Sequence, residues 1–230
     1  MKKLLMALML SLSCAVSAQA AQVDPPQPGE VAQKIKEAAE EAEEKEKERE
    51  REEAWTKELL EKYPEYIDGS VGIMGASRIS EEQMLSYLQS VYPDAPEEVK
   101  QLPGLYLEEG RKEGVRGDVA FAQAVLETGH FEYEGSAVTP DQHNYCGMGV
   151  TRNGLKGESF PTAREGVRAQ IQHLKAYAST EPLNGDCVDP RFELVTRGIA
   201  PSLDSLSRRW AAGDEYGDHI EELMERIASH

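Results

Sequence analysis

Apolar side chains recur at helical spacing in several short runs, the first of which begins near residue 80. Ser80-Glu-Glu-Gln83 has the form of a capping box, in which a serine and a glutamine satisfy the free amides of a helix start. Met84, Leu88 and Val91 then lie on one face, so a short helix is predicted there. Beyond the prolines that follow, a second helix is predicted over roughly residues 104–112.

A third helix is predicted to end at Glu127. Its apolar face consists of Val119, Ala122, Val125 and Leu126. Asp118 precedes this run and is the predicted N-cap, because its carboxylate can accept bonds from the first free amides. Gly129 is predicted to end the helix, because glycine adopts the left-handed conformation readily.

The C-terminal half resumes the helical pattern after a loop-rich stretch. Residues 131–160 are rich in glycine, asparagine and threonine, and they predict loops with one hairpin turned at Arg152-Asn153-Gly154. Thr162-Ala-Arg-Glu165 is another capping box. Three apolar faces follow and predict three helices: Val167, Ile171, Leu174 and Ala178; Leu203, Leu206 and Trp210; and Tyr216, Ile220, Leu223 and Ile227. Residues 69–230 therefore form a predicted mainly helical domain with a small loop-rich or β-hairpin lobe.

A Pro-rich leader and a long charged segment, residues 21–68, precede this domain. Asp24-Pro-Pro-Gln-Pro-Gly29 predicts a stiff, non-helical leader. Residues 30–62 are dominated by Glu, Lys, Arg and Ala, which predict a helix. Large apolar residues are too sparse to specify a coiled coil strongly, so a solvated single helix or a partly disordered stalk is preferred. Trp55, Leu59 and Tyr63 fall at helical spacing and are expected to dock the end of this helix on the domain.

The first residues have the pattern of a secretory signal peptide over residues 1–20. Lys2 and Lys3 provide the positive region, residues 4–15 the apolar core and Ala18-Gln19-Ala20 the cleavage site. Cys14 raises the alternative of a lipid-anchored N-terminus, but the residues before it lack the usual leucine three positions upstream. We therefore expect a secreted protein, either periplasmic or extracellular, without a transmembrane segment.

Net charge changes the list of expected partners. The 230-residue chain carries a formal charge of −17, which argues against nucleic acid and against electrostatic adhesion to an anionic envelope. A polymer bound by this protein must be held by hydrogen bonds, stacking and shape. No cofactor is expected.

Two cysteines, Cys146 and Cys187, remain after the predicted signal peptide. In an oxidising compartment such a pair favours a disulfide over a metal site. The alternative is zinc bound by the cysteines with His130, His143 or His173, but the spacings typical of zinc ligands are missing. The sequence therefore predicts a disulfide and no metal.

Glu127 is the strongest candidate for chemistry. A carboxylate in the last turn of a helix lies near the negative end of the helix dipole, which disfavours the ionised form. Leu126 and Phe131 are placed to desolvate it and raise its pKa further. A carboxyl group that stays protonated near neutral pH is what a general acid requires. The alternative is an exposed glutamate at a frayed helix end.

Three phrases occur in one order: Gly114-Val-Arg-Gly-Asp-Val-Ala-Phe-Ala-Gln-Ala-Val-Leu-Glu-Thr-Gly129, Asp141-Gln-His-Asn-Tyr-Cys-Gly-Met-Gly149 and Gly166-Val-Arg-Ala-Gln-Ile-Gln-His-Leu-Lys-Ala-Tyr-Ala178. Together they resemble the bacterial glucosaminidase domain of glycoside hydrolase family 73, whose members mostly cut peptidoglycan. The resemblance covers the chain from about Gly69 onward. It implies a lysozyme-like α+β fold with the substrate in a cleft, and it places the catalytic acid at Glu127.

A second catalytic carboxylate is less clearly marked. Better-known family members carry it on a β-hairpin, and Glu158 is the only carboxylate within the corresponding residues 150–160 of this chain. The alternatives are Glu132, Glu134 and Asp141, or the 2-acetamido group of the substrate itself. Lytic transglycosylases of the same superfamily work with one essential glutamate, so a second acid is not obligatory.

Five residues are candidates for binding the sugar chain. Asn144 and Tyr145 offer an amide and an aromatic face. Gln123 lies one turn before Glu127 and either orders that acid or lines the groove. Phe160 is a candidate sugar platform, as is Tyr216, although core packing is the simpler interpretation for both.

The sequence therefore predicts a secreted endo-β-N-acetylglucosaminidase that acts on peptidoglycan or another GlcNAc-containing polysaccharide. One alternative is a lytic transglycosylase on the same fold. Another is a non-catalytic glycan-binding or scaffolding protein, in which the charged helix over residues 30–62 binds an envelope protein.

Overall fold

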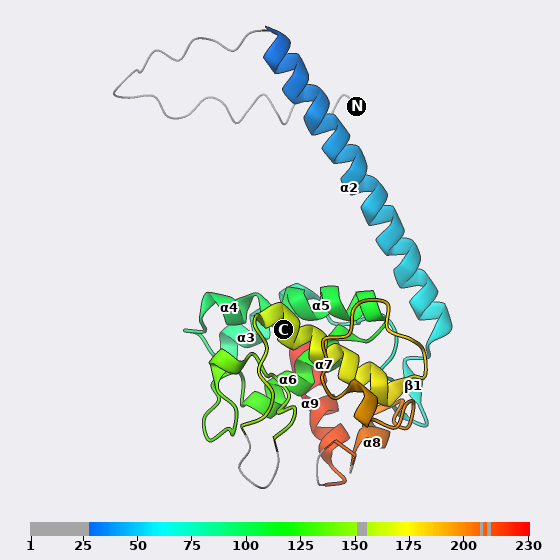
Figure 1. The fold of residues 1–230 in the computed structure, drawn as a ribbon, viewed down its shortest axis with the longest axis vertical. Coiled ribbons are helices and arrows are strands. Elements are labelled where there is room, and N and C mark those ends of the chain that lie inside the picture. Colours follow the sequence, from blue (N-terminus) through cyan, green and yellow to red (C-terminus); the bar gives the residue numbers. More distant parts are fainter. Residues whose placement is uncertain (1–27, 151–155, 208, 211–212) are drawn as a thin grey trace. The chain divides into compact units, whose positions relative to one another are not determined.

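The computed structural model describes residues 28–150, 156–207, 209–210 and 213–230 (Figure 1). These residues form a mainly helical fold with one small antiparallel sheet, as expected for a lysozyme-like α+β domain. The predicted signal peptide, Cys14, most of the Pro-rich leader and the predicted turn at Arg152-Asn153-Gly154 lie outside the described residues. None of the described helices combines the length and the apolar character needed to cross a bilayer.

Four helices build the core. These are α5 (Leu102–Glu113), α6 (Gly117–Thr128), α7 (Ala163–Ala178) and α9 (Tyr216–Ala228). Helix α5 packs on both α6 and α7, and α6 packs on α9 (Figure 1). Every residue of α6 from Gly117 to Val125 is buried, as expected for a helix that has neighbours on all sides. The last turn of α6 is therefore fixed in position by the buried turns that precede it.

Shorter elements surround this core. Helix α3 (Glu81–Val91) begins with the predicted capping box, because Ser80 accepts from Gln83 N and the Gln83 side chain accepts from Ser80 N. The remaining short helices are α4 (Glu97–Lys100), α8 (Leu203–Leu206), and the 3₁₀ turns η1 (Pro140–Gln142) and η2 (Phe192–Leu194). Trp210 lies beyond the end of α8 instead of within a longer helix, which corrects the predicted extent of that element.

The small sheet lies outside the loop-rich lobe, whose predicted hairpin turn falls outside the described residues. Strands β1 (Tyr66–Ile67) and β2 (Ser70–Val71) pair antiparallel before the helical domain. Asp68 and Gly69 between them both have positive φ, 53° and 86°, which is the geometry of a two-residue hairpin turn. In the loop-rich lobe the described residues make only an isolated bridge between Val150 and Lys156.

The start of α6 also differs from its prediction. Arg116, not Asp118, occupies the N-cap position. Asp118 is fully buried, pairs with Arg116 at 2.8 Å and accepts a bond from Arg78 N at 2.8 Å. The buried carboxylate thus fixes the preceding loop, because a buried charge needs a partner more than a helix end needs a cap.

Gly117 and Gly166 permit close approaches that no other residue would allow. A methyl group at Gly117 would collide with the carbonyl of Tyr106, and one at Gly166 with the carbonyl of His143. The first contact brings α6 against α5, and the second brings α7 against the loop-rich lobe. Both approaches help to set the positions of the helices that carry the site.

The charged helix is present as α2 (Pro28–Lys62), which begins within the predicted leader at Pro28. The chain divides into two compact units at Glu50 and Arg51, so the two parts of α2 are described separately. In the first part, exposed pairs such as Glu43 with Lys47 lie four residues apart and support the helix weakly.

The last turns of α2 belong to the second unit and dock as predicted. Leu59 is buried, and the indole of Trp55 donates to the carbonyl of Arg111 at 2.8 Å. Arg111 in turn pairs with Glu52 at 2.7 Å. A hydrophobic contact and two polar contacts therefore fasten this segment to α5.

Candidate active site

Glu127 lies in the last turn of α6 and is only partly exposed. Burial raises the pKa of its carboxyl group, while hydrogen bonds from Tyr216 and Trp210 act in the opposite direction. Burial has the larger effect, so the net shift is upward. The alternative of an exposed glutamate at a frayed helix end is therefore wrong.

A tyrosine on another helix holds one oxygen of this carboxyl group. The Tyr216 hydroxyl, at the start of α9, donates to Oε1 of Glu127 at 2.6 Å. Gln123 Nε2 donates to the same hydroxyl at 2.9 Å. Gln123 is fully buried, so of its two predicted roles the structure favours ordering the acid over lining a groove.

The second oxygen of Glu127 faces a glycine-rich turn. A methyl group built on Gly147 would lie 4.0 Å from Oε2. Gly147 and Gly149 both have positive φ, 64° and 76°, and bend the chain around Met148. Since Gly147 has no side chain, no Cβ atom occupies this position beside Oε2.

Asn144 builds this turn and has no group left for a sugar. Its Oδ1 accepts from Met148 N at 2.9 Å, and its Nδ2 donates to the carbonyls of Met148 and Glu158 at 2.9 and 3.0 Å. The residue is fully buried. The structure thus supports the scaffold interpretation of Asn144, which the sequence left open beside sugar binding.

Tyr145 and Phe160 are also buried. Tyr145 packs edge-on against Tyr106 and Phe131 in the main core. Phe160 packs with Met148 in a second, smaller cluster. Their aromatic faces are used by the protein, which favours core packing over sugar stacking for both.

Glu158 adjoins the same turn as Glu127. A methyl group on Gly149 would lie 2.9 Å from Oε1 of Glu158, so the missing side chain makes room for this carboxylate. Arg191 pairs with it at 3.7 Å, and both side chains are partly exposed. The other carboxylates named from the sequence, Glu132, Glu134 and Asp141, are exposed.

The backbone that follows Glu127 is unusual. Gly129, His130, Phe131 and Tyr133 all have positive φ, between 58° and 64°, and three of them are not glycine. The Thr128 hydroxyl stabilises this run, because it donates to the carbonyl of Ala124 at 2.7 Å and accepts from Phe131 N at 2.9 Å. Such a conformation is strained for side chains with a Cβ atom and is often retained at functional sites.

An aromatic cluster around Trp210, which was predicted only as part of the apolar face of a helix, reaches Glu127. Trp210, which hydrogen-bonds to Glu127, has its ring centre 5.2 Å from that of His173 and 5.6 Å from that of Tyr177. His173 Nδ1 lies 2.7 Å from a carboxylate oxygen of the buried Asp189. No local sequence pattern links these residues, since they come from three separate segments.

The predicted disulfide between Cys146 and Cys187 is wrong, because both thiols are free. Cys146 is buried beside Met148, and burial raises the pKa of its thiol. Cys187 is exposed and lies 3.5 Å from the carbonyl of Asp189. An even number of cysteines favours pairing only if the backbone brings the two Cβ atoms within about 4 Å.

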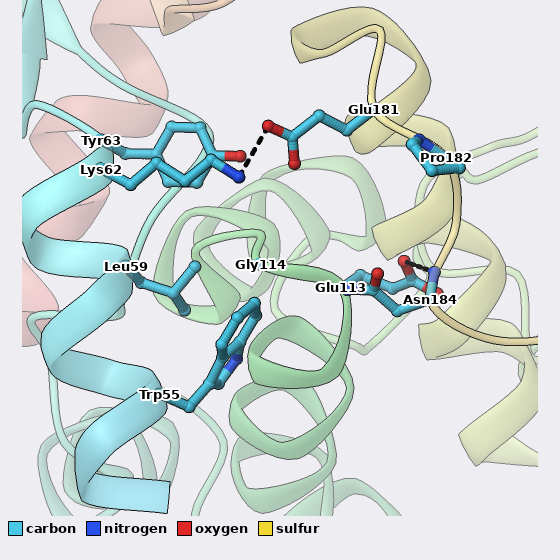
Figure 2. Close-up of a pocket in the computed structure, with 9 residues that line it drawn as sticks. All are labelled: Trp55, Leu59, Lys62, Tyr63, Glu113, Gly114, Glu181, Pro182 and Asn184. Atoms are coloured by element: carbon cyan, nitrogen blue, oxygen red, sulfur yellow. Dashed lines mark hydrogen bonds and ion pairs between the residues drawn. The ribbon is translucent and has the colours of Figure 1, made fainter.

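A separate hollow of about 180 Å³ lies where α2 docks on the domain. Figure 2 shows Trp55 and Leu59 of α2 on one side and Glu181 and Asn184 on the other, with Lys62 paired to Glu181 at 2.9 Å. Its lining includes neither Glu127 nor the residues that contact it. We therefore place the candidate active site at Glu127 and not in this hollow.

Comparison with known proteins gives one family. The sequence profile of the family described as mannosyl-glycoprotein endo-beta-N-acetylglucosaminidase matches residues 104–229, which include the candidate site. A protein of Borreliella burgdorferi whose description is "Uncharacterized protein" is 39% identical over 144 residues, covering 62% of this chain and 70% of the relative. No solved structure matches significantly. The chain therefore belongs to the glucosaminidase family of glycoside hydrolases.

Proposed function

We propose that this protein is a secreted endo-β-N-acetylglucosaminidase that cleaves the β-1,4 bonds of peptidoglycan glycan strands. The observation that supports this most directly is the carboxyl group of Glu127, whose pKa is raised by burial and whose Oε2 lies beside Gly147 of the glycine turn. Membership of the glucosaminidase family supports a glycan as the substrate. The predicted signal peptide agrees with a polymer located outside the cytoplasm.

In this proposal Glu127 is the general acid. Its proton passes to the glycosidic oxygen as the bond from that oxygen to the anomeric carbon breaks. The anomeric carbon is then stabilised either by a carboxylate, for which Glu158 is the candidate, or by the 2-acetamido group of the substrate. Water completes the reaction and returns a proton to Glu127.

The test is digestion of purified cell-wall sacculi by the parent and by Glu127→Gln. Glutamine keeps the size and the hydrogen-bond acceptor but has no acid proton, so we expect the release of soluble fragments to fall by about 10²–10⁴-fold. Glu225→Gln makes the same change at an exposed position for which no role in catalysis is proposed, and it serves as the control. Equal digestion by Glu127→Gln and the parent would show that Glu127 is not the acid.

A lytic transglycosylase is the second candidate function. The observation that favours it concerns the carboxylates around Glu127: Glu158 is paired with Arg191, and Glu132, Glu134 and Asp141 are exposed. Of these carboxyl groups, Glu127 is the one whose pKa is raised by burial. Mass spectrometry of the fragments separates the two reactions, because hydrolysis leaves a reducing GlcNAc and transglycosylation leaves a 1,6-anhydro muramic end. Binding to sacculi without release of sugar would instead support a scaffolding protein.

A further inference from the structure

We propose that the carbonyl of Ala120 sets the direction of a buried hydrogen-bond chain, through Gln170, Gln123 and Tyr216, that commits Oε1 of Glu127 as an acceptor and leaves the acid proton on Oε2. Gln170 and Gln123 are then positioning residues, which act on the reaction through Tyr216. This inference rests on the proposed role of Glu127 as general acid.

Five side chains form the chain, and they come from the four core helices. The Tyr106 hydroxyl donates to Gln170 Oε1 at 2.6 Å, and Gln170 Nε2 donates to Gln123 Oε1 at 2.8 Å. Gln123 Nε2 donates to the Tyr216 hydroxyl at 2.9 Å, which donates to Glu127 Oε1 at 2.6 Å. Tyr106, Gln170 and Gln123 are fully buried and Tyr216 is 8% exposed, so water does not compete for the inner bonds.

Without a further contact, such a chain could run in either direction. The two ends of a glutamine amide have nearly the same shape, and a tyrosine hydroxyl both donates and accepts. Here Gln170 Nε2 also lies 3.0 Å from the carbonyl of Ala120. A backbone carbonyl can only accept, so the NH₂ group of Gln170 must point toward Ala120 and Gln123.

That single constraint decides every later bond. Gln123 must present Oε1 to Gln170 and therefore Nε2 to Tyr216. The oxygen of Tyr216 accepts that bond, and its one proton is directed to Glu127. Because each bond polarises the next, the Tyr216 hydroxyl is also a stronger donor than it would be alone.

The opposite direction would place the catalytic proton on the wrong oxygen. If Gln123 presented Oε1 to Tyr216, the tyrosine proton would turn away from Glu127 and its oxygen would face Oε1. Glu127 would then lose the Tyr216 bond that favours ionisation and keep only the bond from Trp210, and its own proton would bridge Oε1 to Tyr216. Reversal therefore raises the pKa of Glu127 while it removes the proton from Oε2, the oxygen beside Gly147.

The experiment measures the pKa of Glu127 without substrate, by ¹³C NMR titration of glutamate carboxyl groups, with Glu127→Gln used to identify the resonance. We expect Gln170→Met and Gln123→Met each to raise the pKa of Glu127 by about one unit. We also expect each to lower kcat on sacculi by about tenfold or more. Methionine keeps the length of glutamine but has no amide.

Gln172→Met is the matched control. Gln172 is also a fully buried glutamine of α7, but its amide bonds only backbone groups, those of Asp186 and Val188 at 2.8 Å each and that of Asp189 at 3.2 Å. This variant should lose stability as Gln170→Met does and leave the pKa of Glu127 unchanged. A role of Gln170 in stability alone would make the two variants behave alike.

An unchanged or lowered pKa in folded Gln170→Met or Gln123→Met would overturn the proposal. If circular dichroism shows that neither variant folds, Tyr216→Phe removes only the hydroxyl, and an unchanged pKa in that variant also overturns it. If the pKa shifts occur but the parent releases no sugar from sacculi, the chain is present and the proposed function is wrong. If the parent is active and no pKa shift occurs, the function stands and the chain does not direct the proton.

Discussion

The Tyr216 hydroxyl lies 2.6 Å from Oε1 of Glu127, across 89 residues of sequence. The contact joins the first residue of α9 to the last turn of α6. Two effects oppose each other there, because burial raises the pKa of the carboxyl group and the hydrogen bond from Tyr216 lowers it. The acid is therefore both desolvated and fixed in direction.

Replacing Tyr216 with phenylalanine should separate these two effects. Loss of the hydroxyl removes a bond to the ionised form, so the pKa of Glu127 should rise and the alkaline limb of the kcat/KM profile should move to higher pH. We expect kcat to fall by about tenfold, because the carboxyl group loses its orientation. Tyr66→Phe, at an exposed tyrosine of β1, is the control. A shift of the limb to lower pH would contradict this account.

Glu127→Gln should be more stable than the parent at neutral pH. The folded-state pKa of Glu127 lies above its ordinary value of 4.5, so its contribution to stability is fully present below pH 4.5 and is lost as the pH rises through the folded pKa. Glutamine does not ionise, so the variant should gain on the order of 1 kcal/mol at pH 7.5 and little at pH 4.

Urea unfolding at both pH values measures this difference. Glu132→Gln corrects for the general effect of removing one negative charge from an acidic protein. A Glu127→Gln variant that is less stable than the parent at pH 7.5 would show that the ionised carboxyl group stabilises the fold.

Glu158→Gln tests the second carboxylate. If Glu158 acts as nucleophile or base, its replacement should reduce sugar release by about 10²-fold or more. Glu193→Gln is the control, since Glu193 is an exposed carboxylate for which no role in catalysis is proposed. Full activity of Glu158→Gln would favour the acetamido group of the substrate or a transglycosylase reaction, which the fragment masses then distinguish.

Acid stability should depend on Glu109. Burial acts to raise the pKa of this carboxyl group, but hydrogen bonds from Arg168, Lys112 and Arg164 outweigh it and hold the pKa at about 2. A lowered pKa contributes stability that is present above 4.5 and is lost as the pH falls through about 2. Glu109→Gln should therefore lose about 2–3 kcal/mol at pH 7, and the difference from the parent should shrink toward pH 2.

Glu108→Gln is the control for this change. Glu108 pairs with the same Lys112 and Arg164, but its side chain is 41% exposed. We expect a loss below about 1 kcal/mol. Equal losses in the two variants, measured by urea unfolding, would show that burial of Glu109 does not matter.

Leu59 and Leu60 give a neighbouring pair for testing the docking of α2. Leu59 is 2% exposed and Leu60 is 43% exposed. Leu59→Ala should lower the free energy of unfolding by about 2–4 kcal/mol, whereas Leu60→Ala should change it by less than about 0.5 kcal/mol. Similar values for both would mean that the last turns of α2 do not contribute to the fold.

Features set by nearby residues could be predicted from the sequence. The capping box at Ser80, the end of α6 at Gly129 and the docking of Leu59 each depend on positions only a few residues apart or on one apolar side chain. The raised pKa of Glu127 was also predicted in its direction, and burial is the cause of the rise. The hairpin turn at Asp68-Gly69 had an equally local signal, which the sequence analysis did not use.

Features set by distant residues could not be predicted in this way. Asp118 is a residue type that often caps helices, but its carboxylate pairs with the buried guanidinium of Arg116 and accepts a hydrogen bond from the backbone amide of Arg78. The number of cysteines says nothing about the distance between Cys146 and Cys187. The partner of Glu127 on α9 is likewise visible only once the four core helices are packed.

The same four helices that make the core also share one line of buried polar bonds, from Tyr106 to Glu127. We therefore expect no local unfolding around Glu127 while the rest of the helical core stays folded. On heating, the protein should not pass through a folded form that lacks the proposed activity. Its residual activity on glycan should follow the folded fraction. A mutation that strengthens the packing of α5, α6, α7 and α9 should therefore raise the temperature at which activity is lost by as many degrees as it raises the melting temperature.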